Sequence, residues 1–461
     1  MPILSEILKA VGLKRELPLP STQLAAQSIQ ALSPRKNLAL AMPSEDVPVV
    51  IITGRAGTGK STLVRELARV GGPRQVVLAP TGVAALNVGG QTIHSFFRLP
   101  PHIVDPQDIV PLPGRLHLFR NLDRIIIDEM SMVRADLLDA IDVSLRVNRQ
   151  TDLPFGGVKI ILIGDLLQLP PVVPQEEEEI LKDRGYETPY IVSAKVLQRL
   201  RVRFVEMRNV FRQADEEFIQ MLASLRVGSG IERVVDSINE RCHGPHGRPA
   251  TPVILTATNE RADSYNRRKL AALPGRMFVY EGTIQGNFTR QKDKLPAPIR
   301  LELKAGARVV LVKNDSGKRW VNGSLATVTR TNPNSVCVRL DGKSDELEVT
   351  REKWDRIEYR WKHAENRIAA EVVGSYIQIP VKAAWAMTIH KAQGLTLDDV
   401  RIDLGAGAFA SGQAYVAISR VRSLSGLSLA SRLTPADIRV DPTLLAVAEE
   451  IVRHAVGWAE T

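Results

Sequence analysis

The chain has 461 residues, which is long for one hydrophobic core and predicts two to four domains. Hydrophobic residues make up 44% and charged residues 24%, a globular composition that excludes a disordered chain, and no apolar run reaches the about 18 residues that a membrane span needs. An excess of 61 Lys and Arg over 51 Asp and Glu favours a polyanionic partner, while two cysteines and an N-terminus without signal-peptide features indicate a cytoplasmic protein without disulfides or a zinc site.

The predicted elements begin with residues 1–43, an amphipathic helical segment that prolines interrupt. From Val47 the pattern changes to short, continuous apolar runs that end in glycine or polar residues: VPVVIITG, QVVLAP, RIIIDE and VKIILIGD. Continuous runs are typical of parallel strands buried on both faces. Residues 44–200 therefore predict a parallel α/β lobe, with functional residues at the carboxyl ends of its strands. The Pro-rich residues 99–114 predict an inserted loop or subdomain.

A second α/β pattern extends from about residue 201 to residue 290 and includes the run VILTAT. At about residues 291–376 the pattern changes to short runs of alternating apolar and polar residues, separated by Asn-Gly, Asn-Pro-Asn and Asp-Gly-Lys turns. Such short strands predict a small β-barrel. The α/β texture resumes over residues 377–461. The sequence thus predicts an α/β fold of two parallel-sheet lobes, with a β-module inserted in the second.

Residues 54–61, GRAGTGKS, match the phosphate-loop pattern G-x-x-x-x-G-K-[ST] between a predicted strand and a predicted helix. Glycines let backbone N–H groups converge on phosphate, and the helix N-terminus favours anions. We expect Lys60 to reach the β- and γ-phosphates of a nucleotide and the Ser61 hydroxyl to ligate Mg²⁺. The nucleotide contacts predicted here are Gly54, Ala56, Gly57, Thr58, Gly59, Lys60, Ser61 and Thr62.

Two further predicted strands end in candidate catalytic residues. Asp128 and Glu129 follow the run III, so that Asp128 is placed to hold the Mg²⁺ shell and Glu129 to activate the attacking water. After the next strand, the amide of Gln168 in GDLLQLPP is placed to contact the γ-phosphate. The alternative is a simple turn that Asp165 caps.

Six longer motifs, in this order, resemble the Pif-one family of superfamily 1B helicases, in its bacterial type. They are APTGVAALNVGGQTIHSFF, IIIDEMSMVRADLLDAID, PFGGVKIILIGDLLQLPPV, VFRQADEEFIQMLASLRVG, WAMTIHKAQGLTLDDV and GQAYVAISRVRS. The resemblance implies two RecA-like lobes that bind ATP and Mg²⁺ between them. It also implies a monomeric DNA helicase that translocates 5′-to-3′ on single-stranded DNA and unwinds duplex, forked and G-quadruplex DNA. Roles in DNA repair, recombination or telomere-type maintenance, near the bacterial nucleoid, follow from the same resemblance.

The resemblance also implies roles for single residues. Arg212 and Arg420 match arginines that the second lobe offers to the γ-phosphate, Gln168 matches the glutamine that senses it, and Gly394 matches a nucleotide-binding position. The matching DNA contacts are Thr81, Gly82, His94 and Phe96 in the first lobe and Thr258, Asn259, His390 and Lys391 in the second. For Phe96, His94 and His390, a place in the protein core is the alternative.

Two insertions and one departure complete the resemblance. Residues from about 97 to 116 match a small wedge near the DNA fork, and the β-module matches a Src-homology-three-like insertion. The module's cations either cover the bound strand or only solubilise the surface; they are Lys304, Arg308, Lys313, Lys318, Arg319 and Arg330. Where the family reads adenine with a glutamine, this chain has Lys36, and the nearest glutamines, Gln23, Gln27 and Gln30, lie further upstream.

Three other functions fit part of the pattern. A phosphate-loop kinase explains the loop but neither Arg420 nor a second lobe. An ATP-gated clamp that binds nucleic acid without unwinding it explains all the motifs equally well. A RecD-type helicase shares the general motifs, whereas the stretches SMVRADLLDAID and GGQTIHSFF favour the Pif-one family.

Overall fold

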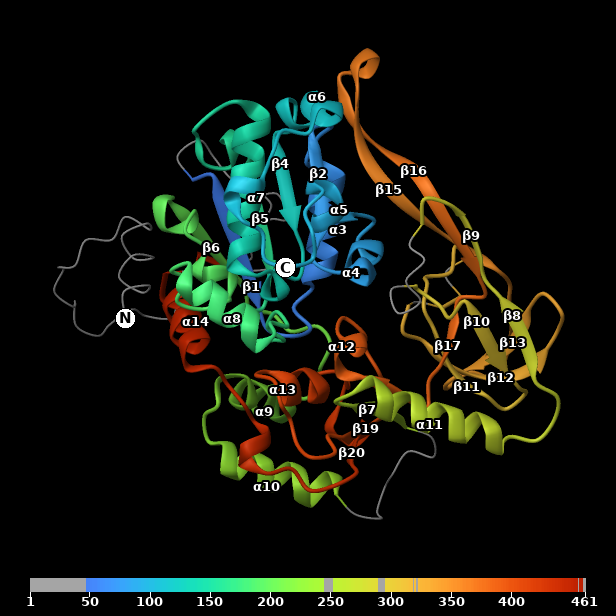
Figure 1. The fold of residues 1–461 in the computed structure, drawn as a ribbon. Helices are drawn as coiled ribbons and strands as arrows, with labels where there is room; N and C mark the ends of the chain where they lie inside the picture. Colours follow the sequence, from blue (N-terminus) through green and yellow to red (C-terminus); the bar gives the residue numbers. More distant parts are fainter. Residues whose placement is uncertain are drawn as a thin grey trace. The chain divides into compact units, whose positions relative to one another are not determined.

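The computed structural model describes residues 47–243, 252–288, 295–317, 319–320, 322–454 and 456–458. The expected helical segment 1–43, with Lys36 and the three glutamines before it, lies outside the described residues. The chain forms two compact units (Figure 1). Unit 1 comprises Met1–Phe211, Glu358–Glu371 and Pro442–Thr461, and unit 2 comprises Arg212–Ile357 and Val372–Asp441.

Unit 1 is built on a seven-stranded sheet in the order β21-β6-β1-β5-β4-β2-β3, and its strand pairs are parallel. The strands are β1 (Val49–Gly54), β2 (Gln75–Ala79), β3 (Gln91–Thr92), β4 (Arg124–Ile127), β5 (Lys159–Gly164), β6 (Val202–Met207) and β21 (Val456–Trp458). All six residues of β1 are buried, and in β5 only the first is not. The continuous apolar runs therefore form central strands covered on both faces, as expected.

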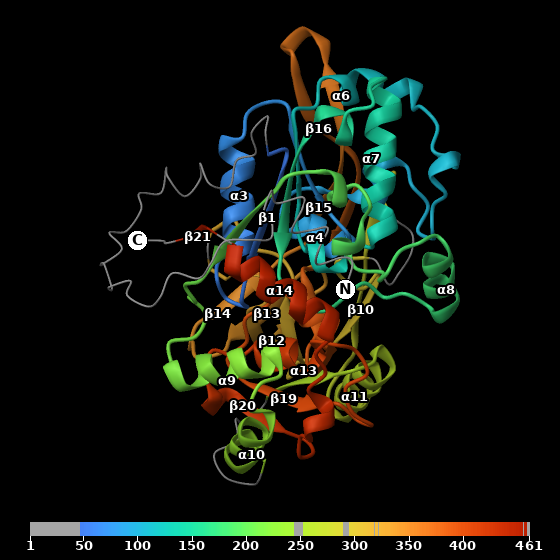
Figure 2. The same ribbon diagram turned by 90° about the vertical axis from the view of Figure 1, so that its left-hand side faces the viewer.

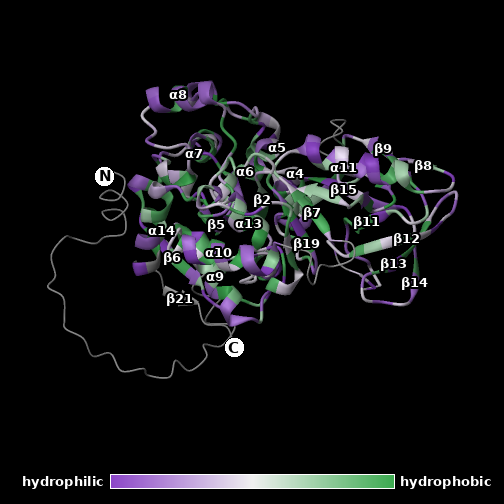
Figure 3. Ribbon diagram, turned by 90° about the horizontal axis from the view of Figure 1, so that it is seen from below, coloured by the Kyte–Doolittle hydropathy of each residue, from purple (hydrophilic) through white to green (hydrophobic). Residues whose placement is uncertain are grey.

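Helices cover both faces of this sheet. They are α3 (Lys60–Val70), α4 (Gly82–Asn87), α5 (Ile93–Phe97), α6 (Leu116–Arg120), α7 (Ala135–Arg149), α8 (Gln175–Asp183) and α14 (Pro442–His454). The connection from β1 to β2 and the connection from β4 to β5 run in opposite directions along the sheet, so right-handed crossovers place α3 and α7 on opposite faces (Figures 1 and 2). Helix α8 is mostly hydrophilic and buries only Leu181 (Figure 3).

Unit 2 contains a four-stranded parallel sheet in the order β18-β7-β19-β20. Its strands are β7 (Val253–Thr256), β18 (Ala386–Thr388), β19 (Val400–Asp403) and β20 (Leu427–Leu429). The accompanying helices are α9 (Glu216–Val227), α10 (Ile231–Cys242), α11 (Asn259–Ala272), α12 (Ile389–Ala392) and α13 (Gln413–Ile418). The prediction of two parallel-sheet α/β lobes is therefore confirmed.

The predicted β-module is present within unit 2 as an antiparallel sheet in the order β14-β13-β12-β11-β17, beside the pair β10-β8. Its strands are β8 (Phe278–Glu281), β10 (Arg300–Leu303), β11 (Arg308–Leu311), β12 (Leu325–Thr331), β13 (Val336–Leu340), β14 (Glu346–Val349) and β17 (Val381–Ala383). Tyr280 of β8 and Val381 of β17 lie in the same buried core as Val309 and Val338. The module therefore extends past both expected limits, residues 291 and 376.

A long hairpin leaves the β-module. It consists of β15 (Glu352–Lys362) and β16 (Arg367–Gln378), and β9 (Thr283–Gly286) pairs with the inner end of β16. The outer part of the hairpin, Glu358–Glu371, belongs to unit 1, although the sequence assigned the whole stretch to the insertion. Figure 1 shows the hairpin as two long strands in orange.

Two other segments differ from the expected limits. The second lobe was expected to start at residue 201 and to include the C-terminus, but β6, α14 and β21 belong to unit 1. Strand β6 pairs with β1 through Val202 opposite Val49. A continuous apolar run predicts a buried strand without saying which sheet it joins, because strand pairing is non-local. Among the described residues, the structure contains no helix with the length and apolarity needed to cross a bilayer.

Candidate nucleotide and DNA sites

The phosphate loop connects β1 to α3. Gly59 precedes the helix with φ of 86°, a left-handed conformation that favours glycine. A Cβ atom at Gly54 would lie 2.7 Å from the Met207 carbonyl oxygen, so only glycine fits there. The Lys60 ammonium curls back and donates hydrogen bonds to the carbonyl oxygens of Gly54 (2.7 Å) and Arg55 (2.9 Å). The loop thus presents backbone N–H groups, a helix N-terminus and one ammonium group at a single place, as expected for phosphate binding.

The catalytic candidates of unit 1 follow three neighbouring strands. The phosphate loop follows β1, Gly164–Gln168 follows β5, and Asp128 with Glu129 follows β4; these strands are adjacent and parallel. Because the carboxyl ends of parallel strands meet at one edge of a sheet, the three segments gather at that edge. The charge of Lys60 acts on Asp128, which agrees with this proximity.

The adjacent carboxylates Asp128 and Glu129 differ in their surroundings. Asp128 is buried, and its Oδ1 accepts a hydrogen bond from the backbone N–H of Glu129 at 3.0 Å. Burial, followed by the negative charge of Glu129, raises the pKa of Asp128 to about 7. Glu129 has φ of 53°, a left-handed conformation that non-glycine residues rarely adopt. Such strained backbone is often found at functional sites.

After β5, Asp165 and Gln168 are both buried. Oδ1 of Asp165 accepts a hydrogen bond from the N–H of Leu167 at 3.2 Å, and Nε2 of Gln168 donates to Oδ2 of Asp165 at 3.4 Å. Asp165 therefore caps the turn, as the alternative interpretation proposed. The same contact also fixes the amide of Gln168, so that the two interpretations do not exclude each other.

Phe211 is a candidate that the sequence interpretation missed. Its backbone N–H donates to the carbonyl oxygen of Gly57 at 2.8 Å, and a Cβ at Gly59 would lie 3.9 Å from its ring. The residue is nevertheless 62% exposed, which is unusual for phenylalanine. An exposed aromatic ring beside a phosphate loop is suited to stacking on a nucleotide base. The sequence signal that could have identified Phe211 is its position directly before Arg212.

Arg212 and Arg420 lie close together in unit 2. Arg212 donates a hydrogen bond from Nη1 to the Ser419 carbonyl oxygen at 3.0 Å, and Arg420 donates from Nη2 to the Ser419 hydroxyl at 2.7 Å. Arg420 is only 2% exposed, and its Nε also donates to the Val416 carbonyl oxygen at 2.8 Å. The structure therefore brings the two arginines together on one scaffold. Gly394, in the left-handed region with φ of 81°, follows α12 in the same unit.

Among the DNA candidates of unit 1, Thr81 and Phe96 have clear structural roles. The Thr81 hydroxyl caps α4 by accepting the N–H of Ala84 at 3.2 Å, and Gly82 begins that helix. Phe96 is fully buried and packs edge-to-face against Phe97, with ring centroids 4.9 Å apart. A ring without exposed surface has no face for a base, so the expectation that Phe96 stacks on DNA is corrected: it belongs to the core. His94 is half-buried on the same helix, α5.

The DNA candidates of unit 2 stand at the starts of two helices. Thr258 caps α11 and is exposed, as is Asn259. His390 and Lys391 lie on α12, where Lys391 is exposed and burial lowers the pKa of His390. Of the four candidates, Thr258, Asn259 and Lys391 are therefore exposed, while His390 is half-buried.

The expected cations of the β-module are engaged in contacts within unit 2, apart from Lys318, which lies outside the described residues. Arg308 pairs with Asp341, Lys313 with Glu352, Arg319 with Asp315 and Arg330 with Glu346, while Lys304 donates to the Leu273 carbonyl oxygen. Of the two interpretations, this pairing favours a structural and solubilising role for these cations over covering a DNA strand.

Lys382 of β17 differs from these cations. Within the described part of the chain, its ammonium has no acidic partner, and the charge that acts on it is the like charge of Lys391. Burial, followed by that repulsion, lowers the pKa of Lys382 to about 8. Two neighbouring cations make this place favourable for an anion.

Comparison with known proteins agrees with this geometry. A family model described as PIF1-like helicase matches residues 37–235. The chain is 34% identical over 440 residues to the human protein named ATP-dependent DNA helicase PIF1, covering 93% of this chain and 65% of the human protein. It is 32% identical over 410 residues to the protein named ATP-dependent DNA helicase Pif1 of Bdellovibrio bacteriovorus, covering 86% of this chain and 87% of that protein.

Solved structures also show similarity to Pif1 proteins. The crystal structure of Bacteroides sp Pif1 in complex with ADP-AlF4 superposes with a TM-score of 0.83 and 34% identity, covering 91% of this chain and 96% of that one. The crystal structure of Bacteroides Pif1 bound to ssDNA superposes with a TM-score of 0.63 and 35% identity, covering 87% and 92%. Because the bacterial relative is 32% identical and is matched along 87% of its length, the chain belongs to the PIF1-like helicase family, the Pif-one family that its motifs resemble.

Proposed function

We propose that this protein is an ATP-dependent DNA helicase that moves along single-stranded DNA and separates duplexes. The observation that carries the proposal is the convergence of the phosphate loop, the Asp128–Glu129 pair and Gln168 at one sheet edge, in a chain of the PIF1-like family. Because the chain spans about two thirds of the human relative's length, the activity, substrates and partners are inferred for this chain on its own residues.

In this proposal, unit 1 carries the chemistry of ATP hydrolysis. Lys60 turns from its carbonyl partners toward the β- and γ-phosphates. The Asp128 carboxylate and the Ser61 hydroxyl are hard oxygen donors that suit Mg²⁺, which neutralises charge on the phosphates when bound. Glu129 accepts a proton from water as the water oxygen attacks the γ-phosphorus. The bond from that phosphorus to the β–γ bridging oxygen breaks, so ADP and phosphate leave.

Unit 2 supplies the second part of the proposed motor. Arg212 and Arg420 bind the γ-phosphate with guanidinium groups, which are always charged and match phosphate geometry. For Arg420 this requires the guanidinium to turn from the Val416 and Ser419 oxygens that now hold it in the interior. Loss of that phosphate after hydrolysis removes the charge that attracts them, so the two units separate and close again around the next ATP. Movement along DNA then requires that the affinity of each unit for the strand differs between the two states.

The proposed strand contacts are hydroxyl, amide and cationic groups, which bind phosphates without reading the sequence. They are Thr81, Gly82 and His94 in unit 1 and Thr258, Asn259, His390 and Lys391 in unit 2. Lys382 joins this group because it lies beside Lys391 without an acidic partner. Phe211 stacks on the adenine and compensates for the lysine at the family's usual adenine-reading position.

The test of this function is a pair of measurements on the full chain. ATP hydrolysis is measured with and without single-stranded DNA, and displacement of a strand is measured on forks with a 5′ or a 3′ tail. We expect hydrolysis to be stimulated by DNA and displacement to require ATP and the 5′ tail, with Lys60→Ala inactive in both. Stimulation without displacement on either fork would identify an ATP-gated clamp instead.

The finer expectations extend this proposal. Unwinding of G-quadruplex DNA and action as a monomer follow from the family resemblance. So do roles in DNA repair, recombination or telomere-type maintenance, and a cytoplasmic location near the bacterial nucleoid. A displacement assay with a G-quadruplex fork, compared with a plain fork of equal length, tests the first of these.

A further inference from the structure

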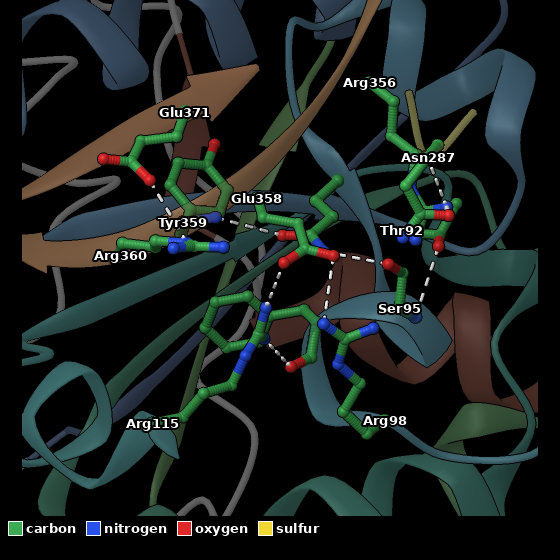
Figure 4. Close-up of polar contacts among 12 residues, drawn as sticks. Thr92, Ser95, Arg98, Arg115, Asn287, Arg356, Glu358, Tyr359, Arg360 and Glu371 are labelled. Carbon is green, nitrogen blue, oxygen red and sulfur yellow. Dashed lines mark hydrogen bonds and ion pairs between the residues drawn. The ribbon is translucent and has the colours of Figure 1, made fainter. Parts of the chain in front are cut away.

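One buried carboxylate contacts both ends of the Pro-rich insertion, residues 99–114. Arg98 stands directly before this segment and Arg115 directly after it. Glu358, on the part of β15 that belongs to unit 1, accepts from Nη2 of Arg98 at 3.0 Å through Oε1 and from Nη2 of Arg115 at 3.4 Å through Oε2 (Figure 4). The two oxygens of one side chain therefore join the two ends of the insertion.

The burial of this group distinguishes it from a surface ion pair. Glu358 is 5% exposed, and the Arg115 side chain is 12% exposed. Burial, followed by the positive charge of Arg98, lowers the pKa of Arg115, so the two guanidinium groups need the carboxylate between them. Arg115 also donates to the Phe96 carbonyl oxygen and lies over the Phe96 ring. The Arg98 side chain is 44% exposed, so the cluster is buried at Glu358 and Arg115 and open to solvent at Arg98.

Neighbouring residues of the hairpin fix Glu358 in place. The Tyr359 hydroxyl accepts the N–H of Val77 at 3.3 Å, and the Tyr359 N–H donates to Oε1 of Gln91 at 3.4 Å. The Tyr359 ring packs edge-to-face on Phe96, with centroids 6.0 Å apart. On the returning strand, the N–H of Ile368 donates to the Pro73 carbonyl oxygen at 2.9 Å. These contacts fix both strands of the hairpin, and they therefore fix the position of Glu358.

The insertion itself has little regular structure. Its described elements are two single-turn helices, η1 (Pro106–Asp108) and η2 (Pro113–Arg115), neither of which contains a buried residue. Arg98, at its start, has φ of 57°, a left-handed conformation that is strained for a residue with a Cβ atom. Between its ends the insertion is held by a few contacts: Arg184 donates to the Val104 carbonyl oxygen at 3.0 Å, and the Leu112 N–H donates to Oδ1 of Asn148 at 2.8 Å. At its two ends it is held by Glu358.

We propose that Glu358 is a positioning residue for strand separation. By pairing with both Arg98 and Arg115, it holds the two ends of the insertion together and keeps the insertion rigid. This inference rests on the proposed helicase function, in which the insertion is the wedge at the fork. A wedge separates strands only if it resists displacement when the motor pulls the duplex against it. Losing the clamp should therefore reduce strand separation more than the hydrolysis that drives it.

The experiment compares two hairpin carboxylates in the full chain. Glu358→Gln removes the charge that joins Arg98 and Arg115, while Glu371→Gln removes a charge that pairs with Arg360 and Lys362 of the same hairpin. Three quantities are measured: hydrolysis stimulated by single-stranded DNA, the rate of fork displacement at saturating ATP, and hydrogen exchange of the peptide that spans residues 99–114. Glu358→Asp, which keeps the charge on a shorter side chain, serves as the conservative variant.

We expect Glu358→Gln to slow displacement about tenfold, with stimulated hydrolysis within about twofold of the unchanged chain and faster exchange in residues 99–114. Glu371→Gln should change none of these, and Glu358→Asp should recover part of the displacement. Displacement and exchange equal to those of Glu371→Gln would overturn the proposal. So would a parallel loss of hydrolysis, which would make Glu358 a general support of unit 1. If the unchanged chain displaces no strand, the proposed function fails, while the exchange measurement still decides whether Glu358 clamps the insertion.

Discussion

Asp128 and Glu129 are neighbours in the chain, yet their carboxylates lie in different surroundings. Asp128 is buried with a raised pKa and suits a cation, whereas Glu129 is only partly buried and stands on strained backbone. We propose a metal-binding role for Asp128, whose buried carboxylate a bound cation would keep ionised, and a proton-accepting role for Glu129.

The first prediction therefore concerns Glu129→Gln. The amide keeps the size of the side chain but accepts no proton, so ATP binding should stay within about twofold while turnover falls by about 10²- to 10⁴-fold. Binding of a fluorescent ATP analogue and steady-state hydrolysis measure the two effects. Turnover at the unchanged rate would remove Glu129 from its role as the base.

The second prediction concerns Phe211. Phe211→Ala removes the exposed ring beside the phosphate loop and should weaken ATP binding by about fivefold, corresponding to about 1 kcal/mol of lost stacking. Phe211→Tyr keeps the ring and should bind normally. If inorganic triphosphate, which has no base, showed the same loss with Phe211→Ala, the ring would be supporting the loop and not the adenine.

The third prediction uses the pKa of Lys382, about 8 in the free protein. Binding to a phosphate raises this pKa, so the contribution of Lys382 to DNA affinity is complete below pH 8 and is lost as the pH rises through the bound-state pKa. The charged or titratable neighbours on the adjacent helix are Lys391 and His390. Lys382→Gln should weaken binding of single-stranded DNA at pH 7 and lower the salt slope by about 0.7, with the difference from the unchanged chain shrinking by pH 9.5.

Lys382→Arg is the matched control for that measurement, because arginine stays charged over the whole range and should keep its affinity at pH 9.5. Lys343→Gln, at an exposed turn of the β-module, controls for the loss of one positive charge anywhere. Equal effects of Lys343→Gln and Lys382→Gln would show that net charge alone is responsible.

At the scale of elements, the β-module is held together by a hydrophobic core and by ion pairs, among them a pair in which the arginine is buried and the carboxylate reaches the surface. Arg308 of β11 is buried and pairs with Asp341 after β13, whereas Arg330 and Glu346 form a pair on the surface. A buried charge that loses its partner is costly, while an exposed pair contributes little.

Asp341→Ala should therefore destabilise the module by about 3 kcal/mol, because Arg308 remains buried without its partner. Glu346→Ala should cost less than about 1 kcal/mol. Hydrogen exchange of the amides in β11, β12 and β13 measures the local free energy of opening. Similar protection in the two variants would mean that Arg308 finds another partner or reaches water.

The elements also show how far the sequence predicts the structure. Local signals were sufficient for the phosphate loop, for strands β1, β4 and β5 and for the Asp128–Glu129 pair, because glycine spacing and continuous apolar runs have direct physical meanings. The sheet that β6 joins and the unit that receives Glu358 depend on contacts distant in sequence. Phe96 was misassigned and Phe211 was missed because burial is not visible in a sequence: Phe96 and Phe97 are both buried, whereas Phe211 is exposed.

At the scale of the whole molecule, the proposed motor needs ATP to control the distance between two units. Unit 1 holds the phosphate loop, and unit 2 holds Arg212 and Arg420 around Ser419. Only a ligand that contacts both groups and differs before and after hydrolysis has the differential affinity to drive such a change.

The most direct measurement is energy transfer between a dye at position 70 of unit 1 and a dye at position 343 of unit 2, both exposed in the structure. Glu129→Gln serves as the background, so that ATP stays bound. We predict that ATP changes the transfer efficiency relative to ADP, and that adding Arg420→Ala abolishes this difference while ATP still binds. An equal response to ATP with and without Arg420 would contradict the claim that the γ-phosphate holds the two units together.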